Sequence, residues 1–251
     1  WVIPLLVASV LIKYVTALLL PFALVMLWRR LPSWHKRLRL AALSAGSSLL
    51  LIYFTLYPYF DVDALRKSFS AQRGLFLTSP GAAIVSIGNR LDWAFDVALW
   101  TRRTGDMVLV LITLVLVALA WRRRLRLERA LFEVMFAFLL VASWNFRPWY
   151  LIWLVALVAL VPLGWPQRRV TVWTVSALLS YAHYIWIREW WPWDRFSFTM
   201  TGIAITFVPV VIVTGTELLT GPWRTAASPH PGADAPPLSG GTRVEVRGPS
   251  V

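Results

Sequence analysis

The chain has 251 residues, of which 58% are hydrophobic, a formal net charge of +13 and a mean hydropathy of +0.64. Its apolar residues form long continuous runs rather than amphipathic stripes, which excludes a water-soluble globular protein. The absence of cysteine excludes disulfides and thiolate metal sites, and three histidines far apart in the sequence indicate no metal cluster.

Seven apolar runs meet or approach the roughly 20 residues that a helix needs to cross a bilayer. In chain order the predicted spans are 2–28, 40–59, 106–121, 130–144, 149–164, 170–187 and 196–219. We therefore predict an all-α polytopic transmembrane helix bundle over residues 1–219. Residues 220–251 are rich in Pro, Gly, Ser and Ala without hydrophobic periodicity, which predicts a disordered tail.

Basic residues concentrate in the links 29–39, 122–126 and 167–169. Because cytoplasmic links carry an excess of Lys and Arg, these links are predicted inside, with the amino end outside and the carboxyl tail in the cytoplasm. The positive charge thus orients helices in a membrane, and it does not indicate nucleic-acid binding. Arginine outnumbers lysine by 22 to 3, which is typical of a GC-rich bacterial genome and favours a bacterial cytoplasmic membrane.

The chain begins at Trp1 inside an apolar run, with no initiator Met and no basic region leading to a cleavage site. This pattern is not that of a signal peptide. We expect the chain to be the carboxyl-terminal part of a larger protein.

Lys13 is the charged residue within the first predicted span. A buried ammonium costs a few kcal/mol, so its side chain is expected to face a wet cavity, an acidic partner or a ligand phosphate. Snorkelling to the outer headgroups is the alternative. His183, near the outer end of the sixth span, is interpreted as a hydrogen-bonded histidine inside the bundle rather than a proton relay.

The long outer link begins with an Asp-x-Asp pattern at Asp61 and Asp63. Paired carboxylates can supply a general base or bind a metal, so both are weak catalytic candidates. The common alternative is that Asp63 caps a helix and Asp61 is solvated. No metal site is predicted from this pattern alone.

The link between the fourth and fifth spans contains Asn145, Arg147 and Pro148, which predicts a tight outer turn. A guanidinium matches phosphate oxygens, and the neighbouring Trp149 and Tyr150 could stack on a sugar or shield a lipid headgroup. The alternative is an aromatic belt with an interfacial arginine.

Three short segments carry a family resemblance: LIKY at 11–14, LLLP at 18–21 and NFRPWYLIWL at 145–154. They resemble the later spans of the GT-C superfamily of polyprenyl-phosphate-sugar glycosyltransferases, particularly bacterial α-mannosyltransferase-like membrane proteins. The outer link around Tyr59, Gln72 and Ser79 fits the same pattern loosely.

This resemblance implies transfer of a sugar such as mannose from a polyprenyl phosphate donor to a lipid-linked or periplasmic acceptor. It implies Lys13, Arg73 and Arg147 on the donor phosphate, with Gln72, Trp149 and Tyr150 as further substrate-binding residues. The partners would be membrane lipids and the lipid-linked donor. No nucleotide cofactor is implied, and a divalent metal is not supported. Members of that family usually carry a catalytic aspartate in the first outer loop, early in the chain, and we expect this sequence to start after that point.

A membrane transporter or lipid flippase is the rival class, in which Lys13 and His183 would serve substrate or proton movement. The sequence shows no internal repeat that would favour it.

Overall fold

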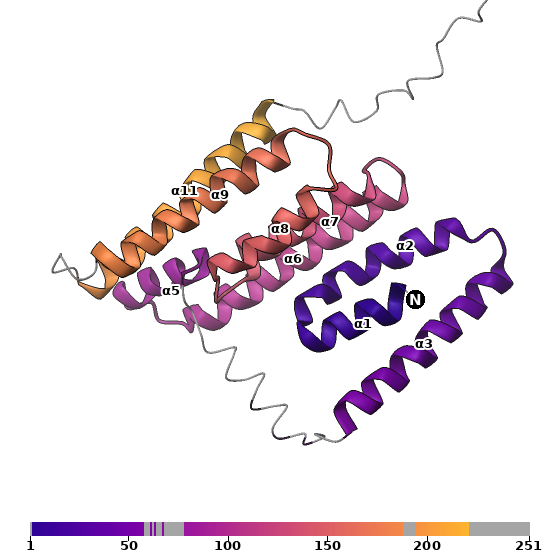
Figure 1. Cartoon of the computed structure of the whole chain (residues 1–251). Coiled ribbons are helices and arrows are strands. Elements are labelled where there is room, and N and C mark those ends of the chain that lie inside the picture. Colours follow the sequence, from indigo (N-terminus) through magenta and orange to yellow (C-terminus); the bar gives the residue numbers. More distant parts are fainter. Residues whose placement is uncertain are drawn as a thin grey trace, which may run out of the picture.

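The computed structural model describes residues 2–57, 61, 63, 67, 78–187 and 194–220. Every element in these ranges is a helix, as the all-α prediction requires (Figure 1). The α-helices are α1 (Val2–Ile12), α2 (Leu20–Arg30), α3 (Trp34–Leu56), α5 (Pro80–Arg90), α6 (Val97–Trp121), α7 (Leu127–Ala137), α8 (Leu151–Val158), α9 (Trp165–Ala182) and α11 (Arg195–Thr220). Shorter turns of 3₁₀ helix are η1 (Tyr14–Leu19) and η4 (Pro148–Tyr150), and turns of π helix are η3 (Phe138–Ala142) and η5 (His183–Ile187).

Four of the helical segments are long and apolar enough to cross a membrane: Trp34–Leu56, Val97–Trp121, Trp165–Ile187 and Phe196–Thr220. They correspond to the second, third, sixth and seventh predicted spans. The third begins nine residues earlier than 106, because the Asp96 carboxylate accepts a hydrogen bond from the Leu99 N–H at 2.9 Å and caps the helix there. Length and composition thus place the chain among membrane proteins.

The first predicted span, 2–28, is not one helix, and this prediction was wrong. The chain breaks at Lys13, whose backbone is extended (φ −149°, ψ 106°), and continues as η1 and α2. Figure 1 shows α1 and α2 running in opposite directions, in contact with each other. Hydropathy cannot reveal this reversal, because an apolar run indicates burial and not direction. Thr16 stabilises the break by donating its hydroxyl to the Lys13 carbonyl at 3.0 Å.

The fourth and fifth predicted spans form a shorter antiparallel pair. The continuous helix α7–η3 ends at Ala142, the chain turns, and η4 with α8 returns along α7. The tight turn predicted from Pro148 is therefore present.

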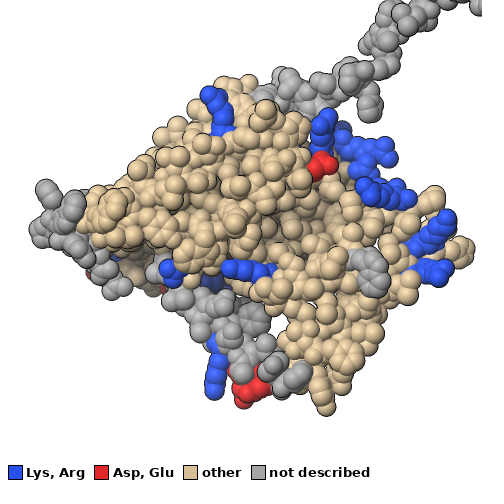
Figure 2. Space-filling model, viewed as in Figure 1, with Lys and Arg blue, Asp and Glu red and all other residues tan. Residues whose placement is uncertain are grey.

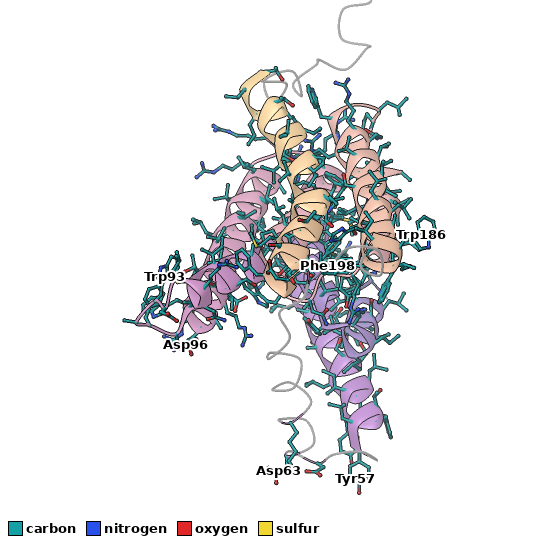
Figure 3. All side chains as sticks on the ribbon, turned by 90° about the vertical axis from the view of Figure 1, so that its left-hand side faces the viewer. Tyr57, Asp63, Trp93, Asp96, Trp186 and Phe198 are labelled. Carbon is teal, nitrogen blue, oxygen red and sulfur yellow. The ribbon has the colours of Figure 1, made fainter. Side chains whose placement is uncertain are left out.

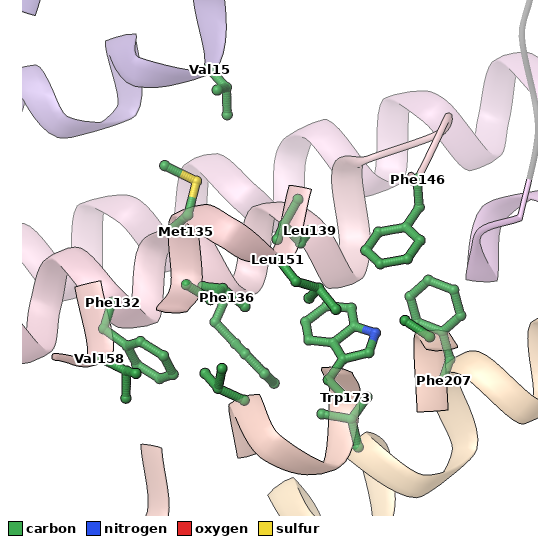
Figure 4. Packing of buried hydrophobic residues seen from close by; sticks show 14 of the residues in the cluster. Val15, Phe132, Met135, Phe136, Leu139, Phe146, Leu151, Val158, Trp173 and Phe207 are labelled. Atoms are coloured by element: carbon green, nitrogen blue, oxygen red, sulfur yellow. The ribbon is translucent and has the colours of Figure 1, made fainter. Parts of the chain in front are cut away.

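The core lies between this pair and the α9–α11 pair, and its centre is aromatic (Figure 4). Trp173 of α9 is fully buried and stacks on Phe146 with ring centroids 5.5 Å apart and planes 4° from parallel. The rings of Phe136 and Phe207 meet Trp173 edge-on at 5.2 and 5.6 Å. Such pairs contribute about 0.5–1.5 kcal/mol each beyond area burial, so this cluster fixes the turn that carries Phe146.

One end of the bundle is strongly basic. The end of α2, the α6–α7 turn and the α8–α9 link lie at this end in Figure 1, and Figure 2 shows Lys and Arg gathered most densely there. We call it the basic end. The α1–η1 break and the turn after η3 lie at the opposite end.

Candidate binding cavity and a buried charge network

A cavity of about 420 Å³ lies where the helix break at Lys13 meets the turn after η3. We call it the Lys13 cavity. It joins two of the three segments that carry the family resemblance, 11–14 and 145–154, although more than 120 residues separate them. Its lining residues are Ile12, Lys13, Tyr14, Val15, Phe138, Ala142, Ser143, Trp144, Asn145, Tyr150 and Trp153.

The Lys13 ammonium lies over two stacked aromatic rings. Its Nζ is 4.5 Å from the ring centroid of Tyr150 and 5.1 Å from that of Trp153, and these two rings are parallel to within 7°. Aromatic faces attract a cation but do not neutralise it. None of the described residues that line the cavity is a carboxylate, so the positive charge remains available to an anionic ligand.

Two glycines hold the turn beside the cavity by accommodating the indole of Trp144. A Cβ built on Gly81 of α5 would lie 2.4 Å from this ring, and one on Gly105 of α6 would also lie 2.4 Å from it. On the other side of the turn, Phe146 is stacked in the aromatic core. The turn is therefore fixed from both sides, and Tyr150 is held facing Lys13.

The cavity also contains polar groups that sequence reasoning did not select. The Asn145 Oδ1 atom is buried and accepts no hydrogen bond from the described residues, and Ser143 is buried beside it. An unsatisfied buried acceptor costs about 1–3 kcal/mol, so a ligand hydroxyl that donates to it would be favoured. Asn145 was visible in the sequence as an amide in an apolar turn, which is the signal that could have selected it.

Arg147 and Trp149 belong to the same turn but do not line the cavity. The Arg147 guanidinium lies 5.6 Å from the ring centroid of Trp149, whose side chain is exposed. The structure thus brings Lys13 and Tyr150 together and leaves Arg147 and Trp149 on the adjacent surface.

Asp61 and Asp63 are exposed, and the Asp63 N–H donates to the Asp61 carboxylate at 2.8 Å, a local turn contact. Figure 3 shows Tyr57 and Asp63 at one extremity of the molecule, away from the helices around Phe198. Gln72 and Arg73 lie outside the described residues. Within the described ranges, no group of three or more His, Asp or Glu side chains converges to hold a metal ion.

A second cluster of charges is buried near the basic end, between α7, α9 and α11. Arg169 donates to both carboxylate oxygens of Glu133, and its Nε lies 2.9 Å from Glu217 Oε2, a charge contact without hydrogen-bond alignment. Arg129 bridges the same two acids through contacts of 2.5 Å. Two arginines and two glutamates cancel, so the network is neutral.

Sequence reasoning missed this network: it placed Arg169 in an inner link and did not single out Glu133 and Glu217 inside the predicted spans. Charged residues inside spans are costly unless paired, and that is the signal that could have found the two acids. Arg169 and Glu217 are each only 2% exposed. We interpret the network as a clamp that joins three helices, because each charge has its partner within the fold.

His183 in η5 is buried, as predicted. Its Nε2 lies 3.0 Å from the Phe198 carbonyl oxygen, and its ring stacks on that of Phe198 at 4.3 Å. At the start of α11, the helix that carries Phe198, the Asp194 carboxylate accepts hydrogen bonds from the Ser197 hydroxyl and from two backbone N–H groups. These hydrogen bonds lower the pKa of Asp194. His183 thus joins η5 to α11, and Asp194 caps the start of α11.

Comparison with protein-family models, with curated protein sequences and with solved structures found no match for this chain.

Proposed function

We propose that the chain is part of a membrane glycosyltransferase that transfers a sugar such as mannose from a polyprenyl phosphate donor to a lipid-linked or periplasmic acceptor. The observation that carries this proposal is the Lys13 cavity, in which an ammonium with no carboxylate partner among the described residues lies over the aromatic rings of the PWYLIWL turn. The Lys13 ammonium would hold the donor phosphate. The faces of Tyr150 and Trp153 would support the sugar ring or the first prenyl unit.

The arrangement suits the charge change of this reaction. When the sugar–oxygen bond to the phosphate breaks, the leaving polyprenyl phosphate gains negative charge, while the acceptor hydroxyl bonds to the sugar carbon and loses its proton. A fixed cation that attracts the growing charge stabilises the transition state more than the ground state. The buried Asn145 oxygen would accept a hydrogen bond from a sugar hydroxyl.

The proton from the acceptor needs a base, and no carboxylate lines the described cavity. Asp61 and Asp63 stay weak candidates for this role. The resemblance implies an aspartate of the first outer loop in this role.

The test is sugar transfer from radiolabelled polyprenyl-phosphate mannose in membranes that contain equal amounts of full-length variants. Lys13→Ala should lower transfer by about 10²-fold or more, as loss of a charge-stabilising donor does. Lys13→Arg should retain part of the activity, and Lys36→Ala, which removes an exposed lysine of α3, should retain all of it. No transfer by the wild type would refute the reaction, and full activity of Lys13→Ala would refute the site.

We further propose that the basic end faces the cytoplasm, so that the tail after Thr220 is cytoplasmic and the Lys13 cavity opens toward the outer leaflet. This orientation follows the excess of arginine at that end (Figure 2). Seven spans with the amino end outside required a continuous first span. The reversal at Lys13 favours placing Val2 on the cytoplasmic half instead.

A lipid flippase is the second candidate, because helices broken inside the membrane line substrate sites in many transporters, and the chain breaks at Lys13. Movement of the polyprenyl-linked sugar between leaflets of proteoliposomes, without transfer to an acceptor, would favour the flippase over the transferase.

A further inference from the structure

A separate hollow of about 670 Å³ lies at the basic end, at the opposite end of α2 from the Lys13 cavity. Three separate stretches of chain form it: the end of α2, the α6–α7 turn with the first residues of α7, and the link after α8. Its lining residues are Arg29, Arg123, Leu125, Arg126, Leu127, Glu128, Ala159, Leu160, Val161 and Pro162.

Three arginines, Arg29, Arg123 and Arg126, line this hollow, and none of them forms an ion pair with a carboxylate of the described residues. Arg29 donates one N–H to the Ala120 carbonyl at 3.0 Å, which ties α2 to the end of α6 and leaves its other donors available. Arg126 precedes α7 without capping it. Glu128 lines the same hollow, so three positive charges and one negative charge leave a local charge of +2.

The backbone of Arg123 has a conformation that is unfavourable for an arginine. Its φ is +58°, the left-handed region, and its N–H donates to the Ala120 carbonyl at 3.1 Å to close the end of α6. Helices that end in this conformation usually place glycine there, because a Cβ disfavours it. A strained arginine at a glycine position indicates that the side chain is needed where it points.

The hollow also has an apolar side. Leu160, in the link after α8, is 63% exposed, and Leu163, three residues on, is 93% exposed. At the level of a membrane surface, such leucines contact acyl chains, while the arginines reach the headgroups. A ligand that satisfies both sides is amphiphilic and carries a phosphate.

We infer that this hollow is a binding site for the phosphate headgroup of an anionic phospholipid in the cytoplasmic leaflet. Guanidinium groups match phosphate oxygens with paired hydrogen bonds, and a charge of +2 suits one phosphodiester or a pair of them. The site is distinct from the donor site proposed above, and it does not depend on the transferase reaction.

The test is binding of phosphatidylglycerol to the purified full chain in detergent, measured by native mass spectrometry and by the rise in melting temperature. We expect a roughly fivefold loss of binding in each of the variants Arg29→Ala, Arg123→Gly and Arg126→Ala, because each removes one arginine near the membrane surface. The triple variant should weaken binding about 100-fold. Arg103→Ala, an exposed arginine of α6 that does not line the hollow, should bind as the wild type does.

Two variants should shift stability or lipid binding in the direction opposite to that expected from a general loss of folding. Arg123→Gly should raise the melting temperature of the lipid-free chain while it weakens lipid binding. Glu128→Gln should tighten binding, because it removes a negative charge from the hollow.

Equal binding of phosphatidylglycerol and phosphatidylcholine would overturn the proposal, as would a triple variant that binds like the wild type. If millimolar inorganic phosphate alone raised the melting temperature as much as the lipid, the ligand would be a soluble phosphate and the lipid assignment would be wrong.

Discussion

The charge network and the Lys13 cavity lie toward opposite ends of the same continuous helix, α7–η3. Arg129 and Glu133 belong to its first two turns, whereas Phe138 and Ala142 line the cavity at its end. In the network every buried charge meets an opposite charge, and the sum is zero. In the cavity a half-buried ammonium lies over two aromatic faces and contacts no carboxylate of the described part of the chain. Pairing, rather than burial, therefore separates a structural charge from one that is available to a ligand.

The largest effect on stability should come from Arg169→Met. Removing one partner of a buried ion pair leaves uncompensated charge and costs about 3–5 kcal/mol, and Arg169 contacts both acids of the network. Thermal unfolding in detergent micelles measures the loss. The double variant Arg169→Met with Glu217→Leu should recover part of it, because it removes one charge of each sign.

Arg168→Met is the matched control for the charge network. Arg168 is exposed, and its guanidinium lies 5.0 Å from the ring centroid of Trp165. Such an exposed cation–π contact contributes about 0.5–1 kcal/mol to stability. If Arg168→Met and Arg169→Met destabilised the protein equally, the network would not be the clamp that we describe.

Gly105→Ala should produce an intermediate effect that reaches the cavity. The added methyl group would lie 2.4 Å from the Trp144 indole and 2.6 Å from the Val141 carbonyl oxygen, and overpacking costs about 1–3 kcal/mol. The displaced turn would move Tyr150 from Lys13 and weaken donor binding. Gly46→Ala, where a Cβ has no neighbour within 4 Å, should instead stabilise α3 slightly. Unchanged donor binding in Gly105→Ala would separate the turn from the site.

Lys13→Met should change stability by less than about 1 kcal/mol, because the lost cation–π contacts are offset by removal of a charge from an apolar region. Melting temperature and donor binding, measured on the same preparation, would show a small change in the first and a large one in the second. A melting temperature lowered as much as by Arg169→Met would make Lys13 a structural charge.

Single cysteines introduced into this cysteine-free chain test which side of the membrane the basic end faces and which side the Lys13 cavity faces. Lys36→Cys and Asp63→Cys replace exposed residues, so both should leave stability unchanged. An impermeant thiol reagent added to intact cells should label Cys at 63 and not at 36. The reverse labelling would place the basic end outside.

Sequence reasoning found local features and missed those that depend on folding. Lys13 and the turn at Asn145 were recognisable because a charge and a proline interrupt apolar runs. The reversal at Lys13 was not, since both halves of the run are equally apolar. The charge network joins Glu133 to Glu217, 84 residues later, and no local pattern predicts which side chains meet between helices. The close approach of Trp144 to Gly81 and Gly105 was hidden for the same reason.

The π turn η3 affects the direction, around the helix axis, in which the turn beside the Lys13 cavity points. A π turn contains about one residue more than an α turn, and one residue corresponds to about 100° of rotation around a helix axis. If the same residues of Phe138–Ala142 were wound as regular α-helix without a change in their number, Trp144 would rotate by about that angle, away from the two glycines. The π turn thus accommodates one additional residue and still points Trp144 at Gly81 and Gly105, so deleting one residue from η3 should leave that direction nearly unchanged.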